Sequence, residues 1–307
     1  MEGERPPRVK PAHARRRGGR IAALLGVVVG VGLVAAIAWA VFGDGGDGAG
    51  ASEVASSTGR TDTAPPKPIL RIVFPEGFTR KEMARRIAAV NQIAEEKRDI
   101  SPSLRPRAYL RSTEDVRSVP AGFRDEDPPH LEGFLFPATY DFNEDTTSKQ
   151  LVDDQLEVFE RTWAELDLEY ADSKNLTPYD VLTIASMIEE EVVVPRERRL
   201  VSAVIYNRLR EGMPLGIDAT IRYGYGIPPT QAILESQLEA DHPYNTRNRV
   251  GLPPTPIANP GLASLEAAAH PADVDYLYFV RKPDCKSHFF TASEAEFLDY
   301  SREGTRC

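Results

Sequence analysis

Cysteine is scarce in this sequence: its 307 residues contain only Cys285 and Cys307, too few for a disulfide-stapled scaffold. The five histidines form no HExxH motif and no paired ligand spacing, so we expect no metal site, and nothing indicates an organic cofactor. Long apolar runs are confined to one stretch, which excludes a polytopic membrane protein. Hydrophobic residues make up 41% of the chain, which excludes disorder throughout.

Basic residues are outnumbered by acidic ones over most of the chain. The net charge is -9, but residues 1–20 carry seven Arg or Lys against two Glu, which leaves -14 on residues 21–307. An acidic body of this kind is a poor binder of polyanions, so we do not expect nucleic acid as a partner.

The one long apolar run, residues 21–42, is uncharged and long enough for a helix to cross a bilayer, which takes about 20 residues. Basic residues precede it and Asp and Gly follow it, so residues 1–20 should form a cytoplasmic tail and the rest should lie outside the cytoplasm of a bacterial cell. The alternative is a cleaved signal peptide, with a small-residue site at Ala49-Gly50-Ala51. A signal peptide's apolar region is normally only about 7 to 15 residues, so we predict an uncleaved single-pass anchor.

Residues 43–67 are rich in Gly, Ser, Thr and Pro and should form a flexible linker. A strand over residues 69–74, a turn and a helix from Thr79 to about Lys97 follow, an order typical of small binding modules. The alternative is an N-terminal subdomain that only packs on the rest. Residues 99–130 are rich in Pro, Arg and Asp with little periodicity, and the sequence is uninformative there.

The remaining patterns predict one more strand and several helices. Thr177-Pro178 is a helix N-terminus, with a capping residue followed by Pro at the first helical position, and Pro195 should end that helix near residues 192–194. The other predicted elements are a buried, Pro-bent strand over 131–142, a helix over about 148–168 and a helix over 196–210.

Three glutamates, Glu189, Glu190 and Glu191, fall in the last turn of the helix that begins at Pro178. At about 100° per residue, Glu190 points away from the apolar stripe and should be a surface residue, while its two neighbours border the stripe. Burial and the negative helix end both raise a carboxyl pKa toward the range useful for acid catalysis. An ordinary acidic helix end remains the alternative that spacing cannot exclude.

Several long segments resemble the endolytic murein transglycosylase (YceG-like) family, in the family's order and over residues 130–300. The resemblance implies an α+β fold with an N-terminal anchor, a LysM-like module or N-terminal subdomain over residues 68–142 and a catalytic domain over residues 143–307. The segments are ASMIEEEV, RRLVSAVIYNRLREGMPLGIDATIRYG, HPYNTRNRVGLPPTPIANPGLASLEAAAHPADVDYLYFV and HFFTASEAEFLDY.

The resemblance also implies site residues. The family's catalytic acid, the last glutamate of an ExE motif, falls on Glu191. Asp218 and Asn259 have structural alternatives, as a helix cap and a turn former. The sequence departs from the family at Gly216 and Ala219, where Gln and Pro are usual, and at Arg247, where Tyr is frequent, which puts details of sugar contact in question. The residues expected to bind substrate are Glu189, Asp218, Tyr244, Asn245 and Asn259.

The implied reaction uses one carboxyl group. Glu191 would protonate the oxygen between N-acetylmuramic acid and N-acetylglucosamine in peptidoglycan glycan strands, and then take a proton from the muramic C6 hydroxyl to leave a 1,6-anhydro end. One rival is a hydrolase with Asp218 as second carboxylate, and another is a non-catalytic cell-wall-binding scaffold. The implied partners are glycan strands, the bacterial membrane and peptidoglycan synthases. A Cys285–Cys307 disulfide is a weaker expectation.

Overall fold

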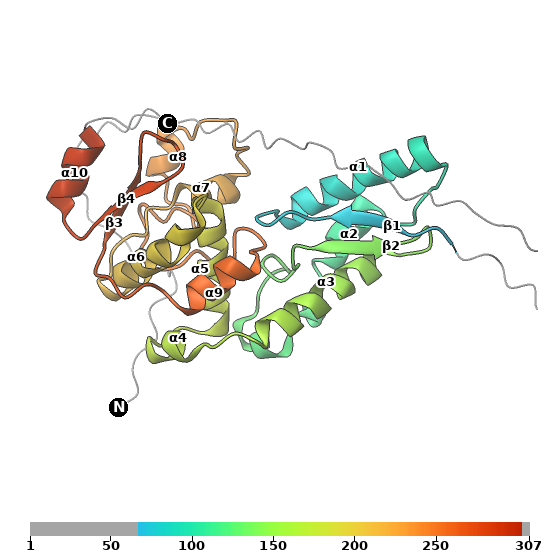
Figure 1. The fold of residues 1–307 in the computed structure, drawn as a ribbon, viewed down its shortest axis with the longest axis horizontal. Coiled ribbons are helices and arrows are strands. Elements are labelled where there is room, and N and C mark those ends of the chain that lie inside the picture. Colours follow the sequence, from blue (N-terminus) through green and yellow to red (C-terminus); the bar gives the residue numbers. More distant parts are fainter. Residues whose placement is uncertain (1–66, 303–307) are drawn as a thin grey trace, which may run out of the picture.

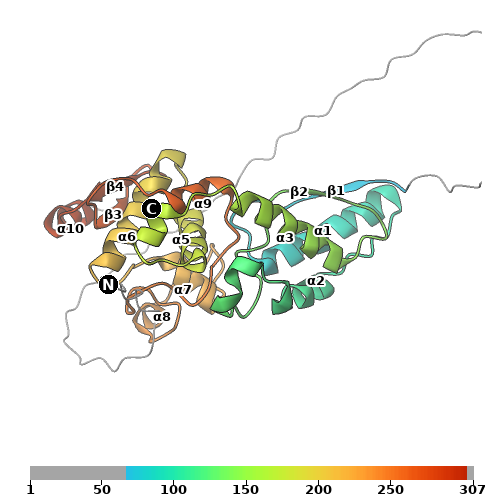
Figure 2. The ribbon, with the colours of Figure 1, turned by 90° about the horizontal axis from the view of Figure 1, so that it is seen from below.

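The computed structural model describes residues 67–302, which form two lobes side by side in an elongated molecule (Figures 1 and 2). Within these residues no helix is both long and apolar enough to cross a bilayer. The predicted tail at 1–20, the predicted anchor at 21–42, the linker up to residue 66 and Cys307 lie outside the described residues.

The N-terminal lobe is built around a two-stranded antiparallel sheet, in which Leu70 lies opposite Phe142 and Val73 opposite Thr139. The first helix begins where predicted, at a capping box in which Thr79 and Glu82 bond reciprocally. The helix over Ser148–Trp163 packs on this lobe, against α2 and β2. The elements are β1 (Leu70–Val73), α1 (Arg80–Arg98), α2 (Pro106–Ser112), η1 (Val116–Ser118), η2 (Ala121–Glu126), β2 (Thr139–Phe142) and α3 (Ser148–Trp163).

Two sequence predictions in this lobe are wrong in extent. The strand predicted over 131–142 is confined to Thr139–Phe142, because Gly133 adopts a left-handed φ of 91° and the chain before β2 bonds to Asn259 rather than to a strand. The helix predicted to residue 168 ends at Trp163, with Ala164 as its C-cap, and a short separate helix begins at Glu169.

The second lobe surrounds one central helix, α5, which packs against α9, α6 and α7 (Figure 1). Every residue from Tyr179 to Ile188 is buried, so the single core stripe predicted from the sequence is too narrow. The helices are α4 (Glu169–Ser173), α5 (Pro178–Glu191), η3 (Pro195–Glu197), α6 (Arg198–Arg210), α7 (Asp218–Tyr225), α8 (Glu235–Glu239) and α9 (Leu262–Ala269).

A hairpin of β3 (Tyr278–Arg281) and β4 (His288–Thr291), followed by α10 (Glu294–Arg302), closes the lobe. The hairpin is fixed to η3 by a buried pair, in which His288 Nδ1 lies 2.8 Å from a carboxylate oxygen of Glu197. Cys285, between β3 and β4, is disulfide-bonded. Its pairing with Cys307 stays a prediction, since Cys307 is outside the described residues.

Candidate active site

The three glutamates lie in the last turn of α5. Glu190 is exposed and its two neighbours are half-buried, which confirms the predicted order of exposure. The N-terminal lobe nevertheless approaches Glu190, because a Cβ added to Gly77 would lie 3.0 Å from its Oε1. Surrounding protein and then the charges of Glu82, Glu189 and Glu191 raise the pKa of Glu190.

Glu191 has the environment of an acid that works near neutral pH. Burial raises its pKa to about 7, and the negative charge of Asp218 adds to the rise. Arg281, a hydrogen bond from the backbone N–H of Ala219 and Arg247 act in the opposite direction. The side chain can therefore exist as acid and as carboxylate within the pH range of a living cell.

Asp218 is the first residue of α7 and pairs with Arg247, whose Nε lies 2.6 Å from its Oδ1. This ion pair involves one of the positions that depart from the family pattern. Gly216, a second such position, adopts a left-handed φ of 68° and donates its N–H to Thr246 O at 2.9 Å. The departures at Gly216 and Arg247 thus lie on the Asp218 side of Glu191.

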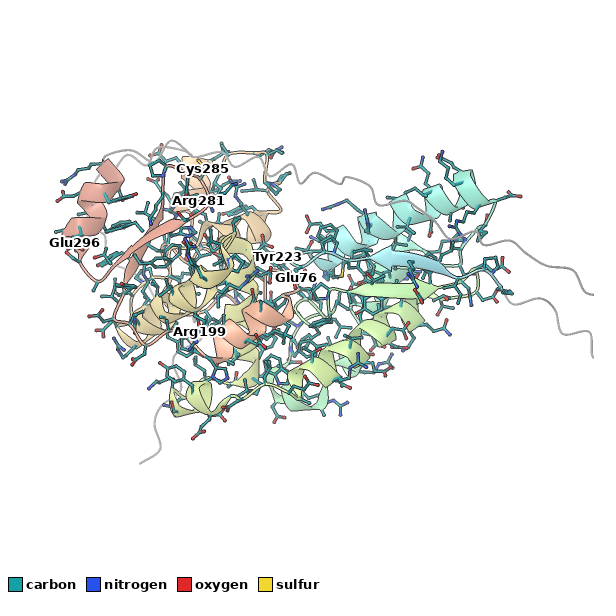
Figure 3. The ribbon with its side chains drawn as sticks, in the orientation of Figure 1. Glu76, Arg199, Tyr223, Arg281, Cys285 and Glu296 are labelled. Atoms are coloured by element: carbon teal, nitrogen blue, oxygen red, sulfur yellow. The ribbon has the colours of Figure 1, made fainter. Side chains whose placement is uncertain are left out.

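Glu189 faces the segment before α9. Its Oε2 accepts a hydrogen bond from Gly261 N at 3.1 Å. Glu76, from the turn after β1, crowds the same glycine, since a Cβ on Gly261 would fall 1.9 Å from Glu76 Oε1. Figure 3 shows Glu76 at the boundary of the two lobes, and burial followed by the charge of Glu189 raises its pKa.

Asn259 is fully buried at this boundary and uses its whole side chain in hydrogen bonds. Its Oδ1 accepts from Gly133 N and Leu135 N, each at 2.9 Å. Its Nδ2 donates to Phe78 O and to a carboxylate oxygen of Glu132, each at 2.8 Å. These bonds hold the N-terminal lobe to the segment that precedes α9, and substrate binding by Asn259 stays a prediction.

Asn245 and Tyr244 lie in the loop after α8. Asn245 is fully buried and donates to Leu238 O at 3.0 Å and to Ala240 O at 2.8 Å, so it shapes this loop. The Tyr244 hydroxyl lies 2.8 Å from Thr255 Oγ1. Their contact with substrate also stays a prediction. The structure brings Asp218 to Glu191 and Asn259 to the inter-lobe boundary.

Two carboxyl groups at this boundary, Glu76 and Glu132, were not predicted from the sequence. Glu132 is only 1% exposed, and burial raises its pKa to about 7 against the opposing effect of its hydrogen bonds. The signal was present in the sequence, since Glu132 is an isolated charge within the apolar run Leu131–Phe136, where an unpaired carboxyl is costly.

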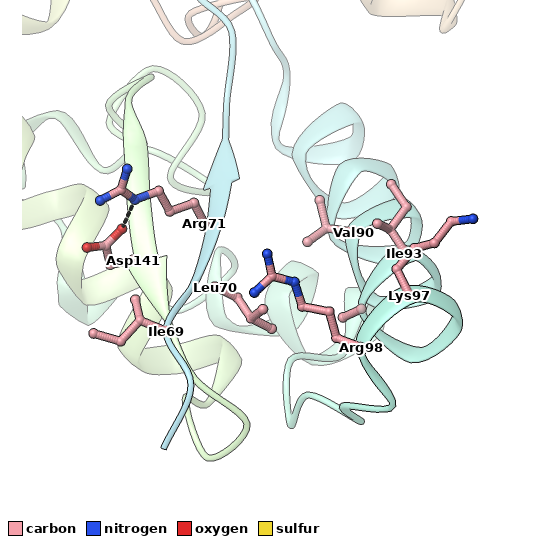
Figure 4. A pocket seen from close by; sticks show the side chains of 9 residues that line it. Ile69, Leu70, Arg71, Val90, Ile93, Lys97, Arg98 and Asp141 are labelled. Carbon is pink, nitrogen blue, oxygen red and sulfur yellow. Dashed lines mark hydrogen bonds and ion pairs between the residues drawn. The ribbon is translucent and has the colours of Figure 1, made fainter. Parts of the chain in front are cut away.

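Other features of the described residues lie away from these carboxyls. No three His, Cys, Asp or Glu side chains of residues 67–302 gather as a metal site would require. A pocket between β1 and α1 combines apolar walls with Lys97, Arg98 and an Arg71–Asp141 ion pair of 2.9 Å (Figure 4). It belongs to the N-terminal lobe alone.

A family model and a solved structure of a known protein indicate the same family for this chain. The model of the YceG-like family matches residues 52–303. A crystal structure of a YceG-like protein from Listeria monocytogenes superposes with a TM-score of 0.62 at 30% identity and covers 75% of each chain.

Curated relatives carry the name endolytic murein transglycosylase. One from Bacillus subtilis (strain 168) is 41% identical over 152 residues, 50% of this chain and 42% of that protein. Another from Streptococcus pneumoniae (strain ATCC BAA-255 / R6) is 33% identical over 244 residues, 72% of this chain and 42% of that protein. The chain therefore spans about two fifths of the length of these relatives.

Proposed function

The chain belongs to the YceG-like family, and on that premise we propose that it is an endolytic peptidoglycan lytic transglycosylase. It would cleave the bond between N-acetylmuramic acid and N-acetylglucosamine inside nascent glycan strands and so limit their length. The relatives named for this activity support the proposal. The observation that carries it in the structure is Glu191, a carboxyl group with a pKa of about 7 beside a backbone donor at the end of α5.

Two successive proton transfers by Glu191 account for the reaction. Protonated Glu191 donates to the glycosidic oxygen as the C1–O bond breaks and positive charge develops at C1. The resulting carboxylate removes the proton of the muramic C6 hydroxyl, whose oxygen bonds to C1 and closes the 1,6-anhydro ring. Glu191 ends in its starting state and no water is consumed, so the enzyme is a lyase. A pKa near 7 suits a group that must act as both acid and base.

A hydrolase is the second candidate, because Asp218 is close enough to be the largest charged contributor to the raised pKa of Glu191. Hydrolytic glycosidases place two carboxyl groups about 5 Å or about 6.5 to 9.5 Å apart. Against this role, the Asp218 carboxylate is already paired with Arg247. An aspartate held in an ion pair is a weakened nucleophile and a weakened base.

The products of uncrosslinked glycan strands distinguish these functions. We expect mass spectrometry of strands incubated with the purified chain to show internal cleavage and 1,6-anhydro-muramic ends. Reducing ends, each heavier by one water, would establish the hydrolase instead. Binding of strands without any cleavage would favour a scaffold.

The finer organisation belongs to the same proposal. Residues 68–142 would form a LysM-like module, supported by the order β1-α1-α2-β2 and by the antiparallel pairing of its two strands. Residues 143–307 would form the catalytic domain, whose first helix, α3, packs against α2 and β2 of the N-terminal lobe. The apolar run at 21–42 would anchor the chain in the bacterial membrane with its N-terminus in the cytoplasm. This placement would bring the enzyme beside the synthases that extrude new strands.

A further inference from the structure

Glu132 is a buried carboxylate that joins three separate parts of the molecule. Its Oε1 accepts from the backbone N–H of Arg80 and from Asn259 Nδ2, each at 2.8 Å. Its Oε2 accepts from the Tyr223 hydroxyl at 3.1 Å. Arg80 is the first residue of α1, Asn259 precedes α9, and Tyr223 belongs to α7.

The three partners all donate, which suits the ionised form of Glu132. An ionised carboxyl offers acceptors only, so each N–H or O–H finds a lone pair. The N–H of Arg80 lies in the first turn of a 19-residue helix, where the helix dipole favours negative charge. A buried carboxylate with both oxygens occupied in this way orders its partners strongly.

Tyr223 connects the hydrogen bonds of Glu132 to the surroundings of Glu191. Tyr223 lies one helical turn from Ala219 in α7, and the Ala219 N–H donates to Glu191. The start of α7 is fixed separately, because Thr246 Oγ1 accepts from Ile217 N at 3.0 Å and lies 3.0 Å from Thr220 Oγ1. Glu132 fixes the other end, and Figure 3 places Tyr223 at the boundary of the lobes.

We propose that Glu132 is a positioning residue for the reaction: through the Tyr223 hydroxyl it holds α7, and with it the backbone donor of Glu191, in register with the N-terminal lobe. This inference rests on the proposed transglycosylase function. Glu132 itself touches neither substrate nor reacting atoms. A displaced catalytic group can lose on the order of 100-fold in rate, so the loss of one hydrogen bond in this chain of contacts should cost about tenfold in kcat.

The test is a double-mutant cycle on the full chain in detergent, with anhydro-end formation as the activity. Tyr223→Phe removes only the hydroxyl, and Glu132→Gln replaces one acceptor by a donor. We expect Tyr223→Phe to lower kcat about tenfold with KM nearly unchanged. The double variant should be no slower than Glu132→Gln alone, because the two residues act through one contact. Glu132→Asp should be nearly as slow as Glu132→Gln, since the shorter aspartate side chain cannot reach all three donors.

Tyr206→Phe is the matched control, because the Tyr206 hydroxyl is also buried but donates to Ala268 O at 2.8 Å, away from Glu132. It should lower the melting temperature as much as Tyr223→Phe does, yet leave kcat unchanged. Wild-type kcat in Tyr223→Phe, or fully additive losses in the cycle, would overturn the positioning role. If Glu132→Gln does not fold, the comparison of Tyr223→Phe with Tyr206→Phe decides alone. A wild-type chain that forms no anhydro ends would refute the proposed function instead.

Discussion

Glu191 is the residue on which the proposed chemistry depends most directly. Glu191→Gln should abolish 1,6-anhydro ends while strand binding persists, because the amide keeps the shape of the side chain but transfers no proton. A general acid or base contributes about 100 to 10,000-fold, and one group that serves both steps should reach the upper end. The measurement is product formation by mass spectrometry beside a strand-binding assay.

The two glutamates before Glu191 provide the control variants. Glu190→Gln should keep most activity, since Glu190 is exposed and no hydrogen bond joins it to α7 among the contacts of the described residues. Glu189→Gln should be intermediate, because it weakens the bond to Gly261 N. Full activity in Glu191→Gln together with a dead Glu189→Gln would move the catalytic role to Glu189.

Glu191→Gln should also change how the stability of the folded protein depends on pH. The pKa of Glu191 is raised in the folded chain from an ordinary 4.5 to about 7, so the folded state binds more protons between these values and stability falls as pH rises through this window. Above pH 7 Glu191 is ionised in both the folded and the unfolded state, and the lost folding stability is not regained. Glu191→Gln should therefore raise the melting temperature by a few degrees at pH 8 and change it little at pH 5, as measured by calorimetry. An equal shift at both pH values would contradict the raised pKa.

At the scale of single elements, local sequence signals predict helix starts well and irregular segments poorly. The capping residues Thr79 and Thr177 begin α1 and α5 where the sequence predicts, because a cap acts within four residues. The segment before β2 fails as a predicted strand, because its backbone donors bond to Asn259, more than 120 residues away. No local pattern contains that partner.

Gly133 allows this irregular segment to form and provides an element-scale test. Its φ is 91°, and an added Cβ would lie 2.7 Å from Cβ and Cγ of Pro256, a rigid neighbour. Gly133→Ala should cost on the order of 2 to 4 kcal/mol of unfolding free energy, from backbone strain and overpacking together. Chemical denaturation measures this cost. Gly122→Ala is the matched control, since no atom lies within 4 Å of the position that its added methyl group would take, and an equal loss there would contradict the steric account.

At the scale of the whole molecule, the sequence predicts a candidate catalytic residue but not how the two lobes meet. The ExE motif singles out Glu191, whereas Glu132 and Glu76 lie in segments without any motif and reach the site only because the lobes adjoin. The close approach of Glu76 to Gly261 joins residues 185 positions apart. Such contacts follow from the packing of complete lobes, which periodicity and composition do not encode.

Topology in the membrane is the last prediction, and it rests on the charge difference across residues 21–42. Seven basic residues precede this apolar run and none lies among residues 43–59, so the N-terminus should stay in the cytoplasm and residues 43–307 should be exported. A reporter active only outside the cytoplasm should work when fused after Cys307 and stay silent when fused after Arg20. The full chain should remain in the membrane fraction after a high-salt wash, since a helix of this length is held by the apolar core rather than by charge. Release of a form that begins near Ser52 would instead establish a cleaved signal peptide, and the glycan strand would then be met by a free enzyme rather than by one tethered beside the site of synthesis.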